Sequence, residues 1–332
     1  MKKLLTLTLA LCLMIGILVP TTAAASTKFW LFAAPPASSA LYPFWVSMGD
    51  AIPTVYPEYA ITVSESQGAV AISKRVRSGE AEIGNSVSAT DYENYHGLGL
   101  FEGDPFPDLR MLFYYEVTAE MICVSKESGI TTIEELAGQR FNPGGVGTSA
   151  ADIFAKVADA LDIKPNYFQA SQADAADAYA NKEIVGTVKL GSFLDSYVMQ
   201  LDAARPVVML DIPEETLDKV IEQYPYLIKV TIPAGTYTFI DHDVNTFGTP
   251  QGAQTTTALS QEDGYKVCKA VMDDGEGKKV WQSAYPIGAE NDLIDLTLRS
   301  AVPLHAGTVQ YLVEKGIEVP ENLIPAEYVP VK

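Results

Sequence analysis

The sequence predicts an α/β fold with parallel strands, because one local order of elements occurs three times. An apolar, strand-like run is followed by a turn of small or polar residues and then by a helix-like stretch. The three turns lie at residues 33–40, 64–68 and 142–149. In parallel sheets, ligands bind outside the carboxyl ends of the strands, beside helix N-termini. The three turns are therefore predicted to form one shared site.

The first unit joins the strand-like "KFWLFAA" (28–34) to the helix-like "LYPFWVSMGDAI" (41–52) through "PPASSA". Pro43 fits only the first turn of a helix, so the helix is expected to begin within a few residues of Ser39. Ser38, Ser39 and Tyr42 are the candidate ligand-binding residues of this turn.

The second unit joins "AITVSES" (60–66) to "QGAVAISKRVRSG" (67–79). Ser66 is predicted to cap this helix, and basic residues occupy its last turn, where the helix dipole favours cations. Ser66 and Gly68 are the candidates of this turn.

The third unit leads from "QRFNPGGVG" (139–147) to Thr148 and Ser149 and then to an amphipathic helix over 150–163. Gly147, Thr148 and Ser149 are its candidates. Each serine or threonine in the three turns has an alternative role as a plain helix cap, and the residues alone leave that alternative open.

Three further stretches have a readable pattern. "GITTIEELAGQRF" (129–141) indicates an exposed loop, a short helix and a strand. "PEETLDKVIEQYP" (213–225) is typical of an amphipathic surface helix ended by Pro225. Residues 260–284 indicate a helix, a polar break and a second short helix.

Residues 1–25 have the form of a secretory signal peptide. A basic start precedes an apolar core (4–19), and "TTAAAS" supplies small residues for cleavage near Ala25. Cys12 lacks the small preceding residue of a lipoprotein site, so we expect a free periplasmic protein. The alternative is an uncleaved membrane anchor, for which the apolar stretch is short.

Composition narrows the classes of partner. The 332 residues are enough for two domains, and the formal net charge is −19 at pH 7. Such a chain repels nucleic acid and anionic membrane surfaces, so neither is expected as a partner. Cys123 lies in a strand-like run and Cys268 in a helix-like one, which favours two buried thiols over a disulfide.

No catalytic constellation stands out in the sequence. None of the three histidines pairs with another at metal-ligand spacing, and no G-x-S-x-G elbow is present. The glycines at 144–147 precede a helix but lack the lysine of a phosphate-binding loop. We therefore expect neither an enzyme nor a cofactor or metal site.

Four blocks resemble the TAXI family of extracytoplasmic solute-binding proteins, which serve TRAP transporters. The most specific is "YPYLIKVTIPAGTYTFIDHDVNTFG" (224–248), similar to the family's Y-P…I-P-A-G-T-Y…D-x-D-V-x-T-x-G block. Residues 77–101, 128–150 and 302–316 are similar to further family segments in the same order. The resemblance extends over nearly all of 28–319.

The resemblance implies a two-lobed, type II periplasmic-binding-protein-like fold, each lobe a mixed sheet flanked by helices, with a ligand cleft between the lobes. Lobe 1 would comprise 26–117 and 244–332, and lobe 2 would comprise 118–243. Such a protein would bind a small organic solute, an organic acid or amino-acid-like, as a monomer. It would deliver this solute to the integral membrane subunits of a TRAP transporter. The alternatives are a protein feeding another transporter or a receptor, and an enzyme on the same scaffold.

The chain departs from the family pattern at the expected site. The family's glycine-rich opening loop is "AAPPASSALYP" (33–43) here, and its two prolines remove N–H donors. Ser149 stands where many members carry an arginine. Lys189, in an otherwise apolar run, is then the best remaining cation for an anionic solute, or else an exposed surface residue. The predicted ligand-binding residues are Ser38, Ser39, Tyr42, Ser66, Gly68, Gly147, Thr148, Ser149 and Lys189.

Overall fold

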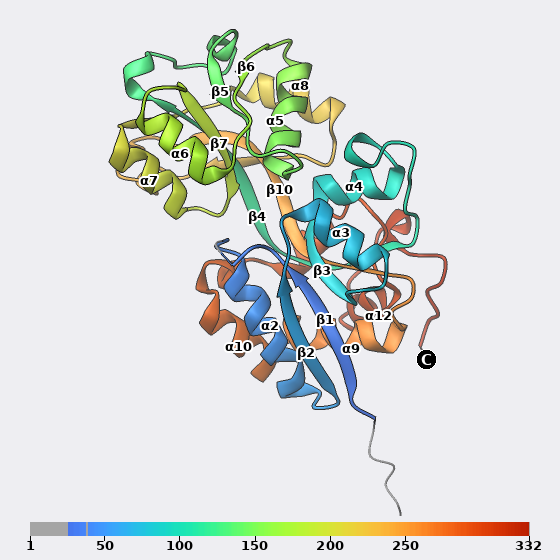
Figure 1. The fold of residues 1–332 in the computed structure, drawn as a ribbon. Helices are drawn as coiled ribbons and strands as arrows, with labels where there is room; N and C mark the ends of the chain where they lie inside the picture. Colours follow the sequence, from blue (N-terminus) through green and yellow to red (C-terminus); the bar gives the residue numbers. More distant parts are fainter. Residues whose placement is uncertain (1–25, 38, 332) are drawn as a thin grey trace, which may run out of the picture.

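The computed structural model describes residues 26–37 and 39–331. The predicted signal peptide, Cys12 and the candidate Ser38 lie outside the described residues. The described chain forms two lobes joined by one hydrogen-bonded sheet of ten strands (Figure 1). The strand order is β2-β1-β3-β10-β4-β7-β5-β6, with β8 on β4 and β9 on β10. The predicted α/β architecture is therefore confirmed.

Lobe 1 contains the parallel strands predicted from the first two units. β1 (Lys28–Ala34) pairs in parallel with β2 (Tyr59–Glu65) and with β3 (Ile83–Val87). One apolar core unites both ends of the chain, from Trp30 to Tyr115 and from Ala253 to Leu323. The helices of lobe 1 are α2 (Tyr42–Val55), α3 (Ala69–Arg77), α4 (Ser88–His96), α9 (Gln261–Met272), α10 (Glu276–Ala284), α11 (Leu293–Thr297) and α12 (Ala306–Glu314).

Lobe 2 repeats this arrangement around a second set of strands. Parallel β5 (Arg140–Asn142) lies between β6 (Asn166–Tyr167) and β7 (Gly186–Gly191), while β8 (Val207–Met209) and β9 (Ile228–Ile232) pair in an antiparallel sense. Its helices are α5 (Ser149–Ala160), α6 (Gln172–Ala180), α7 (Ser196–Ala204) and α8 (Glu214–Gln223). The short 3₁₀ segments of the chain are Gly99–Phe101, Lys126–Ser128, Glu134–Leu136, Pro286–Glu290 and Glu321–Leu323.

Two long antiparallel strands carry the chain between the lobes. β4 (Leu109–Ser125) and β10 (Val244–Thr256) pair along their length, from Thr256 opposite Leu109 to Gly248 opposite Ala119. β10 also pairs with β3 through residues 251–254, in lobe 1, and with β9 through residues 244–248, in lobe 2. A Cβ atom on Gly252 would lie 2.2 Å from the Phe113 carbonyl oxygen, so the ribbon needs glycine there. The exact lobe boundaries, after 117 and before 244, stay a prediction.

Most local expectations outside the cleft are confirmed. The amphipathic helix α8 ends at Gln223, two residues before Pro225, and α9 and α10 are separated by a short polar break. Cys123 and Cys268 are both buried free thiols. Within the part of the chain that the structure describes, no helix has the length and apolar character to span a bilayer.

The predicted role of Ser66 as a helix cap is wrong. The N-cap of α3 is Gly68, and no side chain caps the helix. The Ser66 hydroxyl instead accepts a hydrogen bond from Arg75 at 2.8 Å. The guanidinium also donates to Ser64 and Glu80, and these charge-assisted bonds hold the serine away from the helix N-terminus.

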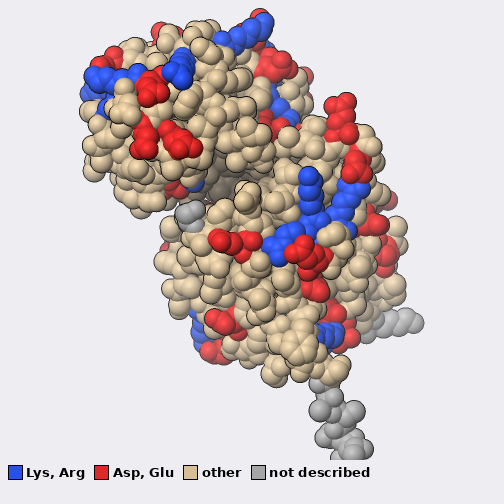
Figure 2. Space-filling view, viewed as in Figure 1, with Lys and Arg blue, Asp and Glu red and all other residues tan. Residues whose placement is uncertain are grey.

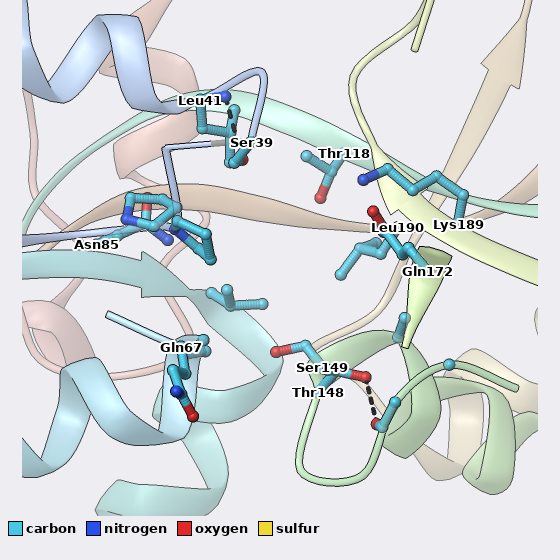
Figure 3. A pocket seen from close by; sticks show the side chains of 18 of the residues that line it. Ser39, Leu41, Gln67, Asn85, Thr118, Thr148, Ser149, Gln172, Lys189 and Leu190 are labelled. Carbon is cyan, nitrogen blue, oxygen red and sulfur yellow. Dashed lines mark hydrogen bonds between the residues drawn. The ribbon is translucent and has the colours of Figure 1, made fainter. Parts of the chain in front are cut away.

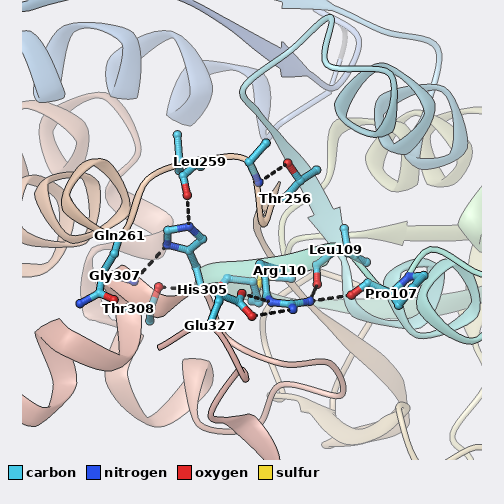
Figure 4. A network of polar contacts seen from close by, with 12 residues as sticks. Pro107, Leu109, Arg110, Thr256, Leu259, Gln261, His305, Gly307, Thr308 and Glu327 are labelled. Carbon is cyan, nitrogen blue, oxygen red and sulfur yellow. Dashed lines mark hydrogen bonds and ion pairs between the residues drawn. The ribbon is translucent and has the colours of Figure 1, made fainter. Parts of the chain in front are cut away.

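A closed polar network lies at the start of β4 (Figure 4). Arg110 donates to both oxygens of Glu327, at 2.6 and 3.0 Å, and to the carbonyls of Pro107 and Leu109. Beside it, the His305 ring caps α12: Nδ1 accepts from Gly307 N at 3.1 Å while Nε2 donates to the Leu259 carbonyl. We call these groups the Arg110–His305 network. Through Glu327, the network connects the C-terminal segment to β4, one of the two strands that join the lobes and that we call the hinge strands.

Candidate functional site

A cavity of about 570 Å³ lies between the two lobes and is lined by both of them. Figure 2 shows it as a hollow between the lobes whose visible rim is mostly uncharged. We call this cavity the cleft. Lobe 1 contributes Pro35, Pro36, Ser39, Leu41, Gln67, Gly68, Ala69, Ile72, Asn85 and Val87, and the hinge strands contribute Thr118 and Gln251. Lobe 2 contributes Gly144, Gly145, Val146, Thr148, Ser149, Ala150, Ser171, Gln172, Val188, Lys189 and Leu190.

The structure brings five of the predicted site residues together in this lining. They are Ser39, Gly68, Thr148, Ser149 and Lys189, drawn from all three predicted turns and from β7. Figure 3 shows most of them facing one another across the space between the lobes. Their contact with a ligand stays a prediction.

Three other candidates lie outside the lining. Tyr42 packs against the core of lobe 1. Ser66 is held by Arg75, as described above. Gly147 has a φ of +74°, so its role in the turn is to supply a left-handed conformation that other residues adopt poorly.

The floor of the cleft contains three polar residues that the sequence analysis missed, namely Asn85, Thr118 and Gln251. They lie on β3 and on the two hinge strands, and each is at most 3% exposed. The signal that could have found Asn85 is a carboxamide in the middle of the short strand-like run "IGNSV", all of whose residues are buried. Gln172 and the backbone at 144–146 complete the missed set.

Hydrogen bonds fix the orientation of the floor. Trp45 Nε1 and the Tyr115 hydroxyl both donate to Asn85 Oδ1 at 2.9 Å. These two bonds fix the orientation of the Asn85 amide. Its Nδ2 then faces Gln251 and donates to Oε1 of that residue at 3.3 Å. Gln251 Nε2 in turn donates to Thr118 Oγ1 at 2.9 Å. The three side chains thus form one chain of hydrogen bonds, in which Asn85 donates to Gln251 and Gln251 donates to Thr118.

This chain leaves donors in excess over acceptors. A primary amide carries two N–H groups, and only one of those on Gln251 has a partner in the floor. The second N–H of Asn85 has only the distant Ser86 carbonyl, at 3.4 Å. The floor is therefore suited to a ligand that presents hydrogen-bond acceptors.

Lys189 lies in the cleft lining and not on the outer surface. Its side chain is 13% exposed and extends from β7 with the amino group toward Thr118 (Figure 3). The amino group is 3.4 Å from a carboxylate oxygen of Asp195, whose side chain is 6% exposed. The other Asp195 oxygen caps α7 by accepting from Tyr197 N at 2.9 Å. The cation that the sequence left as a candidate is thus already paired.

Helix N-termini reach the cleft in different states. Thr148 caps α5: its hydroxyl accepts from Ala151 N at 3.3 Å and donates to the Gly145 carbonyl at 2.8 Å. The structure therefore gives Thr148 the cap role that the sequence left open. α3 begins at the lining residues Gly68 and Ala69 with no side-chain cap, so its first N–H groups have no side chain to satisfy them.

Several contacts join the two lobes directly. The Ser149 hydroxyl, at the start of α5, is 2.9 Å from the Thr90 hydroxyl on α4. One turn further along α4 and two turns further along α5, Glu93, which is 2% exposed, pairs with Lys156. Ser192 of lobe 2 also lies 3.1 Å from the Tyr285 hydroxyl of lobe 1. These contacts set the relative position of the lobes.

Several buried carboxyl groups surround the hinge but do not line the cleft. Burial raises the pKa of Glu116 to about 7 and that of Asp91 to about 8, and it raises the pKa of Glu120 well above its usual range. Glu116 accepts from the Tyr285 hydroxyl, and Asp91 accepts from Ser86. Their titration contributes to the pH dependence of the free energy of unfolding. None of them places a carboxylate in the cleft lining.

The lining offers hydrogen bonds and apolar contact but no acid–base pair. It contains no histidine, cysteine, aspartate or glutamate among the described residues. Across residues 26–37 and 39–331, no three such side chains come together as a metal ion would require. What the arrangement can do chemically is hold a small polar molecule.

The fold is similar to that of several solved structures. The periplasmic aliphatic sulphonate binding protein SsuA from Escherichia coli is 12% identical, with a TM-score of 0.50 over 92% of this chain and 94% of that chain. XAC2383 from Xanthomonas citri bound to chloride is 10% identical, with a TM-score of 0.51 over 77% and 88%. A structure from Streptococcus mutans, described with glutathione import via GshT, is 11% identical, with a TM-score of 0.51 over 81% and 99%.

These likenesses confirm the two-lobed, periplasmic-binding-protein-like fold. At such low identity they carry the architecture alone. The sequence itself gives the family. A model described as the NMT1-like family matches residues 32–316, which is most of the chain, and the protein therefore belongs to the NMT1-like family.

Proposed function

We propose that this protein is an extracytoplasmic solute-binding protein that captures a small organic solute in the cleft and delivers it to a membrane transporter. The observation that carries the proposal is a cavity between two lobes, floored by oriented amide groups on the strands that join them. The cavity volume of about 570 Å³ is in the range of small-molecule sites.

The hinge supports capture by closure. Both lobes contribute to the lining, so a bound solute would gain contacts from each as they approach. The lobes are joined by β4 and β10, which pair from Leu109 to Ala119 with two register shifts, between Gln251 and Gly252 and between Ala253 and Gln254. Closure would therefore bend a two-stranded ribbon and leave both lobes internally unchanged.

A TRAP transporter is the proposed recipient of the solute. The four sequence blocks over 77–316 support this choice, because their order and spacing resemble the TAXI family. The alternative is an ABC importer, which is named together with the Streptococcus mutans structure. The two transporters differ in their source of energy, so the choice can be tested directly.

Capture is tested by screening organic acids, amino acids and neutral metabolites for a rise in melting temperature. We expect a ligand to raise Tm and to lower the radius of gyration in solution X-ray scattering. Ser39→Trp, whose indole would occupy the cleft, should remain folded and lose both responses. A library without a single hit, or a ligand bound equally well by Ser39→Trp, would contradict capture in the cleft.

Delivery is tested in proteoliposomes that contain the membrane subunits encoded beside its gene. We expect solute uptake that depends on the binding protein and on an ion gradient across the membrane. Uptake that instead requires ATP and ignores the gradient would reject the TRAP assignment and keep the binding function.

A further inference from the structure

We propose that the cleft selects solutes without net charge that carry several hydrogen-bond acceptors, and prefers a carboxamide to the matching carboxylate. This inference rests on the proposed function and narrows the class of solute for the same site. Its basis is the balance of charges and donors in the lining.

Lys189 is the one ionisable side chain among the described residues of the lining. Its charge is balanced by Asp195 at 3.4 Å, and both side chains are largely buried. The backbone N–H of Tyr197 holds the Asp195 carboxylate in place beside the amino group. An anionic solute would therefore meet an ion pair and not a free cation. Burying a charge without a partner is costly, so this arrangement disfavours a carboxylate.

The rest of the lining supplies partial charges and no further full charge. The uncapped N-terminus of α3 carries about half an elementary positive charge. Asn85 and Gln251 add amide N–H groups that have no strong partner within the floor. These groups can donate to the carbonyl oxygens of a neutral molecule, whereas a buried carboxylate would receive only partial charges in compensation for its full charge.

The lobe 1 wall of the cleft is mainly apolar. Pro35 and Pro36 stand at the carboxyl end of β1 and offer no N–H donors, and Leu41, Ile72 and Val87 extend the apolar surface. Because Asn85 and the start of α3 belong to the same lobe as this apolar surface, a solute that fits the cleft has acceptors and hydrocarbon close together. Small amides and neutral heterocycles with carbonyl groups have this character.

The proposal is tested with matched acids and amides at pH 7.4. The probes are succinate, succinamate and succinamide, glutarate and glutaramide, and nicotinate and nicotinamide, measured by calorimetry. We expect the neutral member of any set that binds to have a Kd at least about tenfold lower than the acid. A tighter acid overturns the proposal.

The wider screen covers the case in which no matched probe binds. A best ligand with no net charge at pH 7.4 supports the proposal, and a charged one overturns it while leaving the proposed function intact. Failure of every solute, whatever its charge, would instead contradict the proposed function itself.

Two variants test the role of the ion pair. Asp195→Asn keeps an oxygen to cap α7 but leaves the Lys189 charge unbalanced, so the acid-to-amide affinity ratio should shift toward the acid by about tenfold. Adding Lys189→Met to this variant should restore the original preference. An unchanged ratio in Asp195→Asn, with the variant folded, would show that Asp195 does not set the selectivity.

Discussion

The Arg110–His305 network and the floor of the cleft both involve strand β4, but their polar groups are used differently. In the network, Arg110 makes four hydrogen bonds and both ring nitrogens of His305 are engaged. In the floor, Asn85 and Gln251 are oriented by their neighbours yet keep N–H groups without strong partners.

The difference separates structural polar groups from binding ones. A network whose groups are nearly all engaged within the protein stabilises one arrangement and has little left to offer a ligand. An oriented but unsaturated floor contributes less to stability and keeps donors at fixed positions for a solute. If this comparison holds, substitutions in the network should change stability, and substitutions in the floor should change affinity.

The largest expected effect is that of Arg110→Met on stability. The change leaves Glu327 and two carbonyl oxygens without their donor, and Arg110 is 7% exposed. Because Glu327 keeps partial access to water, we expect a loss of about 2 kcal/mol in the free energy of unfolding. Urea denaturation measures it.

The matched control is Arg77→Met. Arg77 makes the same forked contact, to Asp104, at a more exposed site. We expect a loss below about 1 kcal/mol, because exposed ion pairs contribute little. Equal losses in the two variants would show that saturation of the network has no special value.

Two glutamines on β10 provide the sharpest form of the comparison. Gln254 is fully buried and lies outside the cleft lining. It donates to the backbone carbonyl of Asn85 at 2.9 Å and to the Ser73 hydroxyl. Gln254→Leu should cost about 1.5 kcal/mol of stability, with little change in affinity. Gln251→Leu should do the reverse and weaken solute binding about tenfold, as one lost hydrogen bond does. The comparison fails if Gln251→Leu binds as well as the parent.

The network also predicts a pH effect with a definite sign. Burial lowers the pKa of His305, whose neutral ring accepts from Gly307 N and donates to Leu259. The unfolded chain takes up a proton near pH 6.5 before the folded chain does, so unfolding becomes easier as the pH falls below about 6.5. The slope reaches at most about 1.4 kcal/mol per pH unit.

His305→Asn isolates this contribution, because asparagine retains an oxygen for the helix cap but does not titrate. Unfolding free energies of both proteins between pH 7.5 and 5 give the difference. Asp91, Glu116 and Glu120 titrate equally in the two proteins and cancel. Parallel curves would mean that His305 is not held neutral.

The smallest expected effect concerns Thr148 in the cleft. Its hydroxyl caps α5 through a long contact of 3.3 Å, so Thr148→Val should cost only about 0.5 kcal/mol of stability. Thr148→Ser should restore the cap. Since the hydroxyl is already engaged, we expect solute affinity to change less than threefold in either variant. A tenfold loss in Thr148→Val alone would show a direct ligand contact.

The sequence predicted the turns around the site better than the residues on its floor. Local patterns identified the turns that supply Ser39, Gly68 and Thr148, because a strand, a small polar turn and a helix are encoded by adjacent residues. Which side chains of a central strand face the cleft depends on lobe packing, so Gln251 and Thr118 gave no local signal.

The roles of individual side chains could not be predicted for the same reason, because they depend on contacts that form only in the folded protein. Ser66 has the sequence of a helix cap, but Arg75 approaches it from the far end of α3. Tyr42 directly follows Leu41, which lines the cleft, but its own side chain packs against the core of lobe 1. Lys189 was left open between surface and cleft, and only the fold shows Asp195 beside it.

The order of the chain through the two lobes has a consequence for the order in which they fold. Apart from Ala89, the buried apolar residues of the two lobe 2 clusters lie between Ala119 and Val244 or Phe247, an uninterrupted stretch. Lobe 2 can therefore fold from one continuous segment before the later residues of the chain are available. The core of lobe 1 lacks Val267, Trp281 and Leu312 until the last part of the chain has joined it. The apolar strands β1 to β3, and not lobe 2, are thus the part of the chain that stays without its core partners for longest.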